Sequence, residues 1–329
     1  MHAAIVGLPG PILDAETRAT LRAHPPAGVI LFGRNVQNHA QVKQLLTDLR
    51  ALLPPEAVLM VDQEGGRVAR LKPPEFPAFP AAGRIGALHA QNPEAGRRAA
   101  RLAGAGIGLM CRGLGFDVVC APVLDLLEPG ANVVIGDRSF GSDPAIVAQL
   151  GRDFAEGMGE GGVQPVIKHM PGHGRARVDS HLAMPELDAP DARELEPFQA
   201  NADLPWGMTA HILFRTLDAT RPATLSSVVL RDVVRGQIGF DGVLMSDDLA
   251  MQALSGPPAL RAQRALEAGC DLALFCPGSN RDNRVVMGLL PHVSDVTAAR
   301  MARGRDWVQT RRMEMDAAAV HAELEALLA

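Results

Sequence analysis

The chain has 329 residues, of which 47% are hydrophobic and 21% charged, and its formal net charge is −5. This composition is typical of a globular protein and excludes wholesale disorder. The negative net charge gives no electrostatic footprint for nucleic acid or an anionic membrane, so we expect neither as a partner.

The first ten residues, MHAAIVGLPG, lack the basic and apolar regions of a secretory signal. No window of the sequence reaches the roughly 18 apolar residues of a membrane span. We therefore expect a cytoplasmic protein. The cysteines have neither CxxC spacing nor the density of a disulfide scaffold and are predicted to be buried free thiols: Cys111, Cys120, Cys270 and Cys276.

Apolar runs of strand length recur along the chain, and most are separated by enough sequence for a helix. In chain order, the predicted strands are residues 3–7, 28–32, 58–62, 116–121, 164–169, 207–211, 242–247 and 271–276. Three intervening segments carry helix signals: an apolar stripe after Asn38, a segment after Ser226 and Ser227, and residues 259–268 before Gly269. Alternating buried strands and helices indicate parallel pairing.

Polar residues follow several of these runs at their carboxyl ends. Asp62, Lys168, His169, His211 and Asp247 all occupy such positions. Barrel enzymes place catalytic groups there, whereas a doubly wound sheet concentrates them at one switch point. We predict an α/β fold in which residues 1–329 form a single (β/α)8 TIM barrel, with C-terminal helices from about residue 281 packing on it. Without coiled-coil heptads, we expect a monomer.

The stretch QPVIKHMPGHGRARVDSHLAMP, residues 164–185, passes from a buried strand into a polar loop. Lys168 is one of only three lysines in an arginine-rich chain, so a compact ammonium is apparently required at this strand end. Asp179 and His181 lie two residues apart, and an aspartate can fix one tautomer of an imidazole that moves protons near neutral pH. His173 either shares this chemistry or only shapes the turn between two glycines.

Two further segments carry charged side chains. VDQEGGRVARL, residues 61–71, places Asp62 and Arg70 after the third strand, where they either hold sugar hydroxyls or form an ion pair in a turn. In the DRSF segment, Arg138 either reaches the same pocket or caps a loop.

The run GVLMSDDLAM, residues 242–251, ends in two adjacent carboxylates. Because side chains alternate along a strand, we expect only one of them to face the barrel mouth. Asp247 is a candidate nucleophile, metal ligand or helix cap, and capping alone would account for Asp248. His211 is either a satisfied core histidine or a support for the site.

The motifs VDQEGGR, KHMPGHG, DSH and SDDLAM, in this order and spacing, resemble the bacterial β-N-acetylglucosaminidases of glycoside hydrolase family three, of the cell-wall recycling type. The resemblance implies a cofactor-free, metal-free barrel enzyme that removes terminal β-linked N-acetylglucosamine from peptidoglycan fragments, the N-acetylglucosaminyl-anhydromuramyl peptides. It implies that Asp247 is the nucleophile, His181 the acid/base and Asp179 its orienting partner. It also assigns sugar binding to Asp62, Arg70, Arg138, Lys168 and His169.

Several alternatives remain open from the sequence. A metal-dependent hydrolase on the same barrel would draw on the histidines and Asp247. A non-catalytic sugar-binding protein would share the fold. Within the family, a β-glucosidase or a broader hexosaminidase is the nearest alternative, since no residue type by itself shows how a 2-acetamido group would be held. A histidine acid/base also leaves phosphorolysis open beside hydrolysis.

Overall fold

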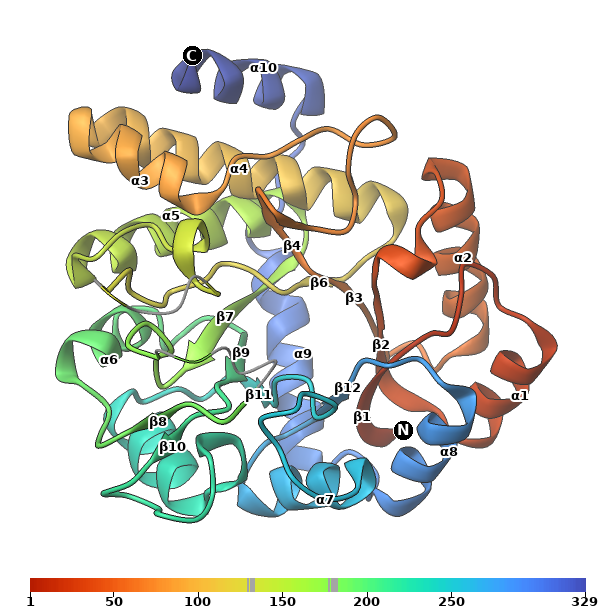
Figure 1. Cartoon of the computed structure of the whole chain (residues 1–329). Helices are drawn as coiled ribbons and strands as arrows, with labels where there is room; N and C mark the ends of the chain where they lie inside the picture. The colour runs from red at the N-terminus through yellow and green to blue at the C-terminus, as the bar shows by residue number, and fades with distance from the viewer. Residues whose placement is uncertain (129, 131–133, 177, 179–182) are drawn as a thin grey trace.

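The computed structural model describes residues 1–128, 130, 134–176, 178 and 183–329. Within these ranges, eight parallel strands form one sheet in the order β11, β9, β7, β6, β3, β2, β1, β12. A parallel bridge from Met245, the last residue of β11, to Leu272, just before β12, joins the two edges. The sheet is thus a nearly closed barrel surrounded by helices (Figure 1), and the predicted (β/α)8 fold is confirmed.

Each predicted apolar run coincides with one barrel strand. The strands are β1 His2–Gly7, β2 Pro26–Leu31, β3 Val58–Val61, β6 Val118–Val119, β7 Gln164–Met170, β9 Trp206–Thr209, β11 Val243–Met245 and β12 Ala273–Phe275. Two short pairs were not predicted: the antiparallel β4 Gln63–Gly65 with β5 Val68–Ala69, and the parallel β8 Glu186–Leu187 with β10 Leu213–Phe214. Both pairs are too short for periodicity to reveal them.

The helices alternate with the barrel strands as predicted. They are α1 Ala15–Ala23, η1 Gly33–Asn35, α2 His39–Leu52, α3 Ala82–Gln91, α4 Pro93–Leu114, η2 Gly136–Arg138, α5 Pro144–Gly161, α6 Ala192–Gln199, η3 Ala223–Leu225, η4 Val229–Gln237, α7 Pro258–Ala268, α8 Asn280–Leu289, α9 Asp295–Gln309 and α10 Ala317–Leu328. Asn38 caps α2 by accepting from the backbone N–H of Gln41, and α7 ends at Gly269. The helix after Ser226 is the π-helix η4.

The barrel interior and its outer surface are separate apolar layers, because successive side chains of a strand point to opposite faces. Along β1, Ala3 and Ile5 point into the barrel, where they join Met60, Val166 and other interior side chains. Ala4 and Val6 point outwards into the layer packed under the helices. The four cysteines are free and buried, as predicted.

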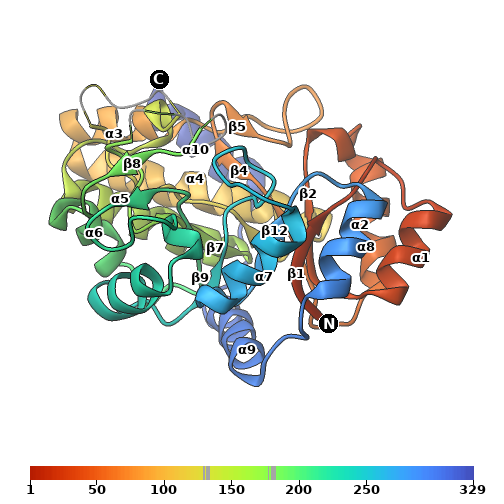
Figure 2. The same ribbon diagram turned by 60° about the horizontal axis from the view of Figure 1, so that its bottom comes forward.

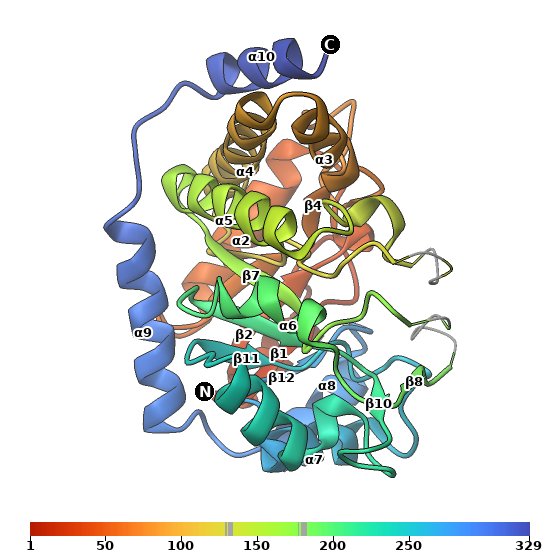
Figure 3. The same ribbon diagram turned by 90° about the vertical axis from the view of Figure 1, so that its left-hand side faces the viewer.

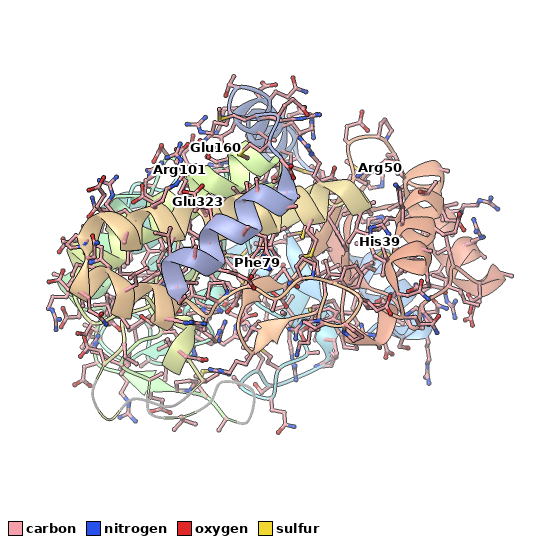
Figure 4. All side chains as sticks on the ribbon, turned by 90° about the horizontal axis from the view of Figure 1, so that it is seen from above. His39, Arg50, Phe79, Arg101, Glu160 and Glu323 are labelled. Atoms are coloured by element: carbon pink, nitrogen blue, oxygen red, sulfur yellow. The ribbon has the colours of Figure 1, made fainter. Side chains whose placement is uncertain are left out.

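The two ends of the barrel are covered differently. At the amino ends of the strands, α9 closes the barrel: Met301 packs with the interior layer and Gly304 lies against Gln164 and Trp206. Figures 2 and 3 show α9 on one side of the barrel and β4 and β8 on the other, and Figure 3 shows β10 beside β8. Figure 4 shows α10 lying across α4. None of the described helices is long and apolar enough to cross a membrane.

Candidate active site

A cavity of about 290 Å³ opens among the segments that follow the barrel strands. Its walls come from the carboxyl ends of strands far apart in the sequence. The lining includes six residues predicted to bind sugar or act as nucleophile, which are Asp62, Arg70, Arg138, Lys168, His169 and Asp247. The other two predicted residues, Asp179 and His181, lie outside the described residues. The barrel therefore gathers every described residue of the prediction at one site.

Lys168 is buried between two carboxylates. Its Nζ lies 2.6 Å from Oε1 of Glu64 and 3.3 Å from Oδ1 of Asp62, and its side chain is 3% exposed. Burial acts to lower the pKa of the ammonium, but the charges of Glu64 and Asp62 outweigh it and hold the pKa above its ordinary value. The lysine is consequently a fixed positive charge at the base of the cavity, as its unusual occurrence in this chain suggested.

Glu64 is the residue that sequence reasoning underrated. Besides binding Lys168, it accepts a two-pronged ion pair from Arg138, with Nε at 2.8 Å and Nη2 at 2.9 Å. Burial acts to raise the pKa of Glu64, yet the two cations lower it to about 2. Glu64 thus fixes two predicted sugar-binding residues at once. The signal available in the sequence was the second carboxylate of the VDQEGGR motif.

The segment around Asp62 forms the ion pair in a turn that the sequence offered as one interpretation, and it also lines the cavity. It forms a turn, since Gly65, the last residue of β4, and Gly66, which follows it, have φ of 94° and 56°. It also forms an ion pair, because Arg70 Nη2 lies 3.1 Å from Oδ2 of Asp62. Arg70 stacks over the Phe32 ring, and its buried Nε finds no acceptor among the described residues. The same segment therefore forms the turn, the ion pair and part of the cavity wall.

Lys168 and His169 both reach the cavity, although they are neighbours on β7. In a regular strand they would point to opposite faces. The pairing between β7 and β9 is irregular between Lys168 and Met170, which interrupts the alternation at this point. The irregular strand end therefore gives the cavity two adjacent side chains from a single strand.

Asp125 was not predicted, yet it is buried directly behind His169. Its Oδ2 lies 2.7 Å from Nδ1 of His169, and its Oδ1 accepts the backbone N–H of His173 at 2.7 Å. Burial acts to raise the pKa of Asp125, but His169 and His173 hold it below its ordinary value. Asp125 interrupts the apolar run 121–127 soon after the fourth predicted strand, and this position was its only signal.

The carboxylates of Asp247 and Asp248 make different contacts. Asp247 is an ionised carboxylate in the cavity wall: burial acts to raise its pKa, but its interactions with His211, His169, the backbone N–H of Asp248 and the ammonium of Lys168 hold it below the ordinary value. Oδ1 of Asp248 instead accepts the N–H groups of Ala250 and Cys276. Burial raises the pKa of Asp248.

One alternative and one expectation about this pair are wrong. Asp248 does not cap a helix, since the next helix among the described residues begins at Pro258. Both carboxylates line the cavity, because β11 ends at Met245 and its alternation does not extend to them. The loop after β11, rather than the strand pleat, decides how the two side chains point.

His211 supports the site from behind and does not line it. Its Nε2 lies 3.0 Å from the carbonyl oxygen of Asp248 and its Nδ1 lies 2.8 Å from Oγ1 of Thr224. Because a carbonyl only accepts, the Nε2 atom carries the proton. Burial lowers the pKa of His211 and favours this neutral form. His211 is therefore a satisfied core histidine that also holds the loop of Asp247.

His173 lies in the cavity wall with its ring 5.9 Å from that of His169. Burial lowers the pKa of His173 to about 4, so the ring is neutral at physiological pH. Among the described residues, no three His, Cys, Asp or Glu side chains are grouped so that they could hold a metal ion.

Residues 7–304 match the family described as glycosyl hydrolase family 3 N terminal domain. The chain belongs to glycoside hydrolase family 3. Two curated relatives, both named β-hexosaminidase, agree with this placement. The protein from Thioalkalivibrio sulfidiphilus is 40% identical over 296 residues, covering 88% of this chain and 84% of the relative. That from Methylococcus capsulatus is 41% identical over 284 residues, covering 82% and 81%.

Solved structures resemble this fold closely. NagZ from Neisseria gonorrhoeae, in complex with N-trifluoroacetyl-D-glucosamine, has a TM-score of 0.88 and 32% identity, covering 100% of this chain and 98% of that one. A family 3 β-N-acetylglucosaminidase from a Paenibacillus species has a TM-score of 0.83 and 29% identity, covering 99% and 66%. The family resemblance and the barrel predicted from the motifs are both confirmed.

Proposed function

We propose that this family 3 glycoside hydrolase is a retaining exo-β-N-acetylglucosaminidase. Its substrates would be peptidoglycan fragments, the N-acetylglucosaminyl-anhydromuramyl peptides, from which it would remove terminal β-linked N-acetylglucosamine. The β-hexosaminidase names of the relatives and the amino sugar held by the Neisseria NagZ support this specificity. The observation that carries the proposal is the ionised Asp247 in the wall of a cavity with fixed charges. A cytoplasmic, monomeric enzyme without a cofactor belongs to the same proposal and rests on the family resemblance.

The proposed reaction is a double displacement. A carboxylate oxygen of Asp247 forms a bond to the anomeric carbon while the bond from that carbon to the leaving oxygen breaks, and His181 gives its proton to that oxygen. Water then attacks the same carbon, His181 takes the water proton, and Asp247 leaves as a carboxylate. Asp179 would hold the His181 ring. The roles of His181 and Asp179 rest on the family resemblance that the DSH motif carries.

Sugar binding would use the donors and acceptors that the protein leaves open. Lys168 carries three donors, of which Glu64 and Asp62 engage two among the described residues. Arg70 lines the same cavity, and its Nη2 pairs with Asp62. His169 presents its Nε2 side to the cavity, because Asp125 holds Nδ1. These groups would fix one ring before Asp247 attacks it.

A cavity of about 290 Å³ favours one terminal ring over an extended chain, since pockets for small ligands begin at about this size. The proposal therefore specifies exo cleavage. Water and phosphate compete as acceptors in the second step, and both fit a histidine acid/base, because neutral imidazole does not repel an anion. Product analysis with and without phosphate decides between them: free N-acetylglucosamine indicates hydrolysis, and its 1-phosphate indicates phosphorolysis.

The first prediction concerns the nucleophile. Asp247→Ala should lower turnover of an aryl β-N-acetylglucosaminide by about 10³-fold or more, because no covalent intermediate can form. In the wild type, a fluorosugar should leave its label on Asp247, as mass spectrometry of peptides would show. In the pH profile of the wild type, the acid limb set by Asp247 should have an apparent pKa below the ordinary range of an aspartate.

The control variant is Asp306→Ala, on α9 at the opposite end of the barrel, which should retain full turnover. A label on Asp248 or Glu64 would contradict the assignment. Comparing release from the aryl glucoside and the aryl N-acetylglucosaminide tests specificity. Preference for the glucoside would refute the proposed substrate.

A further inference from the structure

Asp125 connects three segments around the candidate site. It lies in the loop after β6, and its side chain is fully buried. It contacts His169 at the end of β7 and His173 at the start of the loop that leads to Asp179 and His181. The carbonyl oxygen of Asp125 also accepts from Oγ of Ser139, which directly follows Arg138. A single carboxylate thus contacts both a predicted sugar-binding residue and the base of the predicted acid/base loop.

The hydrogen bonds of this carboxylate dictate where His169 carries its proton. An ionised carboxylate only accepts, so the Nδ1 atom of His169, at 2.7 Å, must be the donor. The two carboxylate oxygens also accept the backbone N–H of His169, at 3.2 and 3.3 Å, which fixes the start of the side chain. In the neutral ring, the Nε2 atom is consequently left as an acceptor, and the side-chain hydrogen bond of His169 among the described residues uses Nδ1 instead.

We propose that Asp125 is a positioning residue: it holds His169 as the Nδ1–H tautomer, so that Nε2 accepts a hydrogen bond from a sugar hydroxyl, and it ties this contact to the first turn of the acid/base loop through the N–H of His173. The inference rests on the proposed function for the identity of the sugar. Asp125 itself does not touch the substrate, because His169 lies between it and the cavity.

The isosteric variant Asp125→Asn separates these roles. The carboxylate has two acceptor oxygens, whereas the amide has only one. The amide can therefore accept a hydrogen bond from the backbone N–H of His173 or from Nδ1–H of His169, but not from both. The backbone N–H cannot change its role, whereas an imidazole can move its proton to the other nitrogen. The amide oxygen should therefore face His173 and the amide NH₂ should face Nδ1. The proton of His169 should then move to Nε2, turning the acceptor into a donor.

The second prediction is read by nitrogen NMR of histidine-labelled enzyme, with the signals of His169 assigned from His169→Gln. In the wild type the Nδ1 atom should be protonated and Nε2 should not. In Asp125→Asn the two should exchange, and kcat/KM for the aryl β-N-acetylglucosaminide should fall about 10- to 100-fold, as when a carboxylate orienting a ligand histidine is removed. In an enzyme that already carries His169→Gln, adding Asp125→Asn should lower kcat/KM much less than it does in the wild type.

A matched control is Asp153→Asn, which alters another buried carboxylate, paired with Arg97 on the helical layer. It should leave the tautomer of His169 and kcat/KM unchanged. A wild-type proton on Nε2 would overturn the proposal without any variant, even if Asp125→Asn does not fold. The proposal would also be overturned if the kcat/KM of the double variant fell by the full product of the losses measured in Asp125→Asn and His169→Gln alone. If the wild type shows the expected tautomer but releases no N-acetylglucosamine, the proposed function fails and the positioning geometry stands.

Discussion

Glu64 illustrates how single buried charges organise this site. A carboxylate with a side chain only 6% exposed would be costly alone, but Lys168 and Arg138 both pair with it. Its pKa of about 2 is below the ordinary value of 4.5 for a glutamate. A carboxyl group whose pKa is depressed by folding stabilises the fold above its unfolded pKa, and that stability is lost as the pH falls through the folded pKa.

The third prediction therefore concerns Glu64→Gln. The variant leaves two buried cations without their shared anion, so its free energy of unfolding at pH 7 should fall by about 3 to 5 kcal/mol. Urea unfolding should show this loss at pH 7. The difference from the wild type should shrink as the pH falls from about 4.5 towards 2, the window set by the unfolded and folded pKa values of Glu64.

The exposed pair of Glu186 and Arg215 provides the comparison. Glu186→Gln should change the free energy of unfolding by less than about 1 kcal/mol, since solvent screens an exposed ion pair. If Glu64→Gln and Glu186→Gln lowered the free energy of unfolding equally, burial of the Glu64 ion pairs would not contribute to stability.

At the scale of elements, the β4–β5 hairpin holds Glu64 in place. Gly65 has a φ of 94°, and a Cβ atom there would overlap the carbonyl oxygen of Pro80. The N–H of Gly66 donates to the carbonyl oxygen of Phe79 at 2.9 Å. The hairpin can therefore lie this close to segment 79–81 only because both positions are glycine.

The fourth prediction is that Gly65→Ala lowers the free energy of unfolding by about 2 to 4 kcal/mol, through left-handed strain and overlap with Pro80. Because Glu64 precedes it, KM for the aryl substrate should also rise. Thermal unfolding and steady-state kinetics measure the two effects. The control is Gly113→Ala, at an open position in α4, which should raise stability by about 0.5 to 1 kcal/mol. Unchanged stability and KM in Gly65→Ala would contradict the role of the hairpin.

At the scale of the whole molecule, we propose that residues 1–329 form one domain that includes the C-terminal helices. The barrel and α9 share an apolar layer through Met301. α10 buries Val320 and Leu324, and its His321 contacts Phe79 of the segment that packs on the β4–β5 hairpin. Figure 4 shows Phe79 next to α10. The last helix is thus connected by packing to the segment that supports the site.

The fifth prediction concerns a chain ending at Glu314, which lacks α10. Its free energy of unfolding should be lower by roughly 3 to 6 kcal/mol, because two apolar side chains lose their burial. Urea unfolding followed by circular dichroism should show one cooperative transition in both proteins. Glu323→Gln, which removes only the exposed pair with Arg98, should cost less than about 1 kcal/mol. A separate early transition in the full chain would contradict a single domain.

The sequence by itself determined the strands, their order and the residues at their ends. Local signals suffice for this, because the length of an apolar run and the position of a polar residue after it are properties of neighbouring residues. Lys168, Asp62 and Asp247 were predicted in this way, and the barrel brings them together. The roles of Asp179 and His181 stay predictions from the sequence, since both residues lie outside the described part of the chain.

Only the tertiary structure decided how these side chains are held. Glu64 and Arg138 are 74 residues apart, and Asp125 and His169 are 44 apart, so no local pattern could pair them. The direction of Asp248 depended on where β11 ends and on the N–H groups of a distant segment. Burial gives these contacts their strength, because a charge removed from water must find its partner wherever the fold places one.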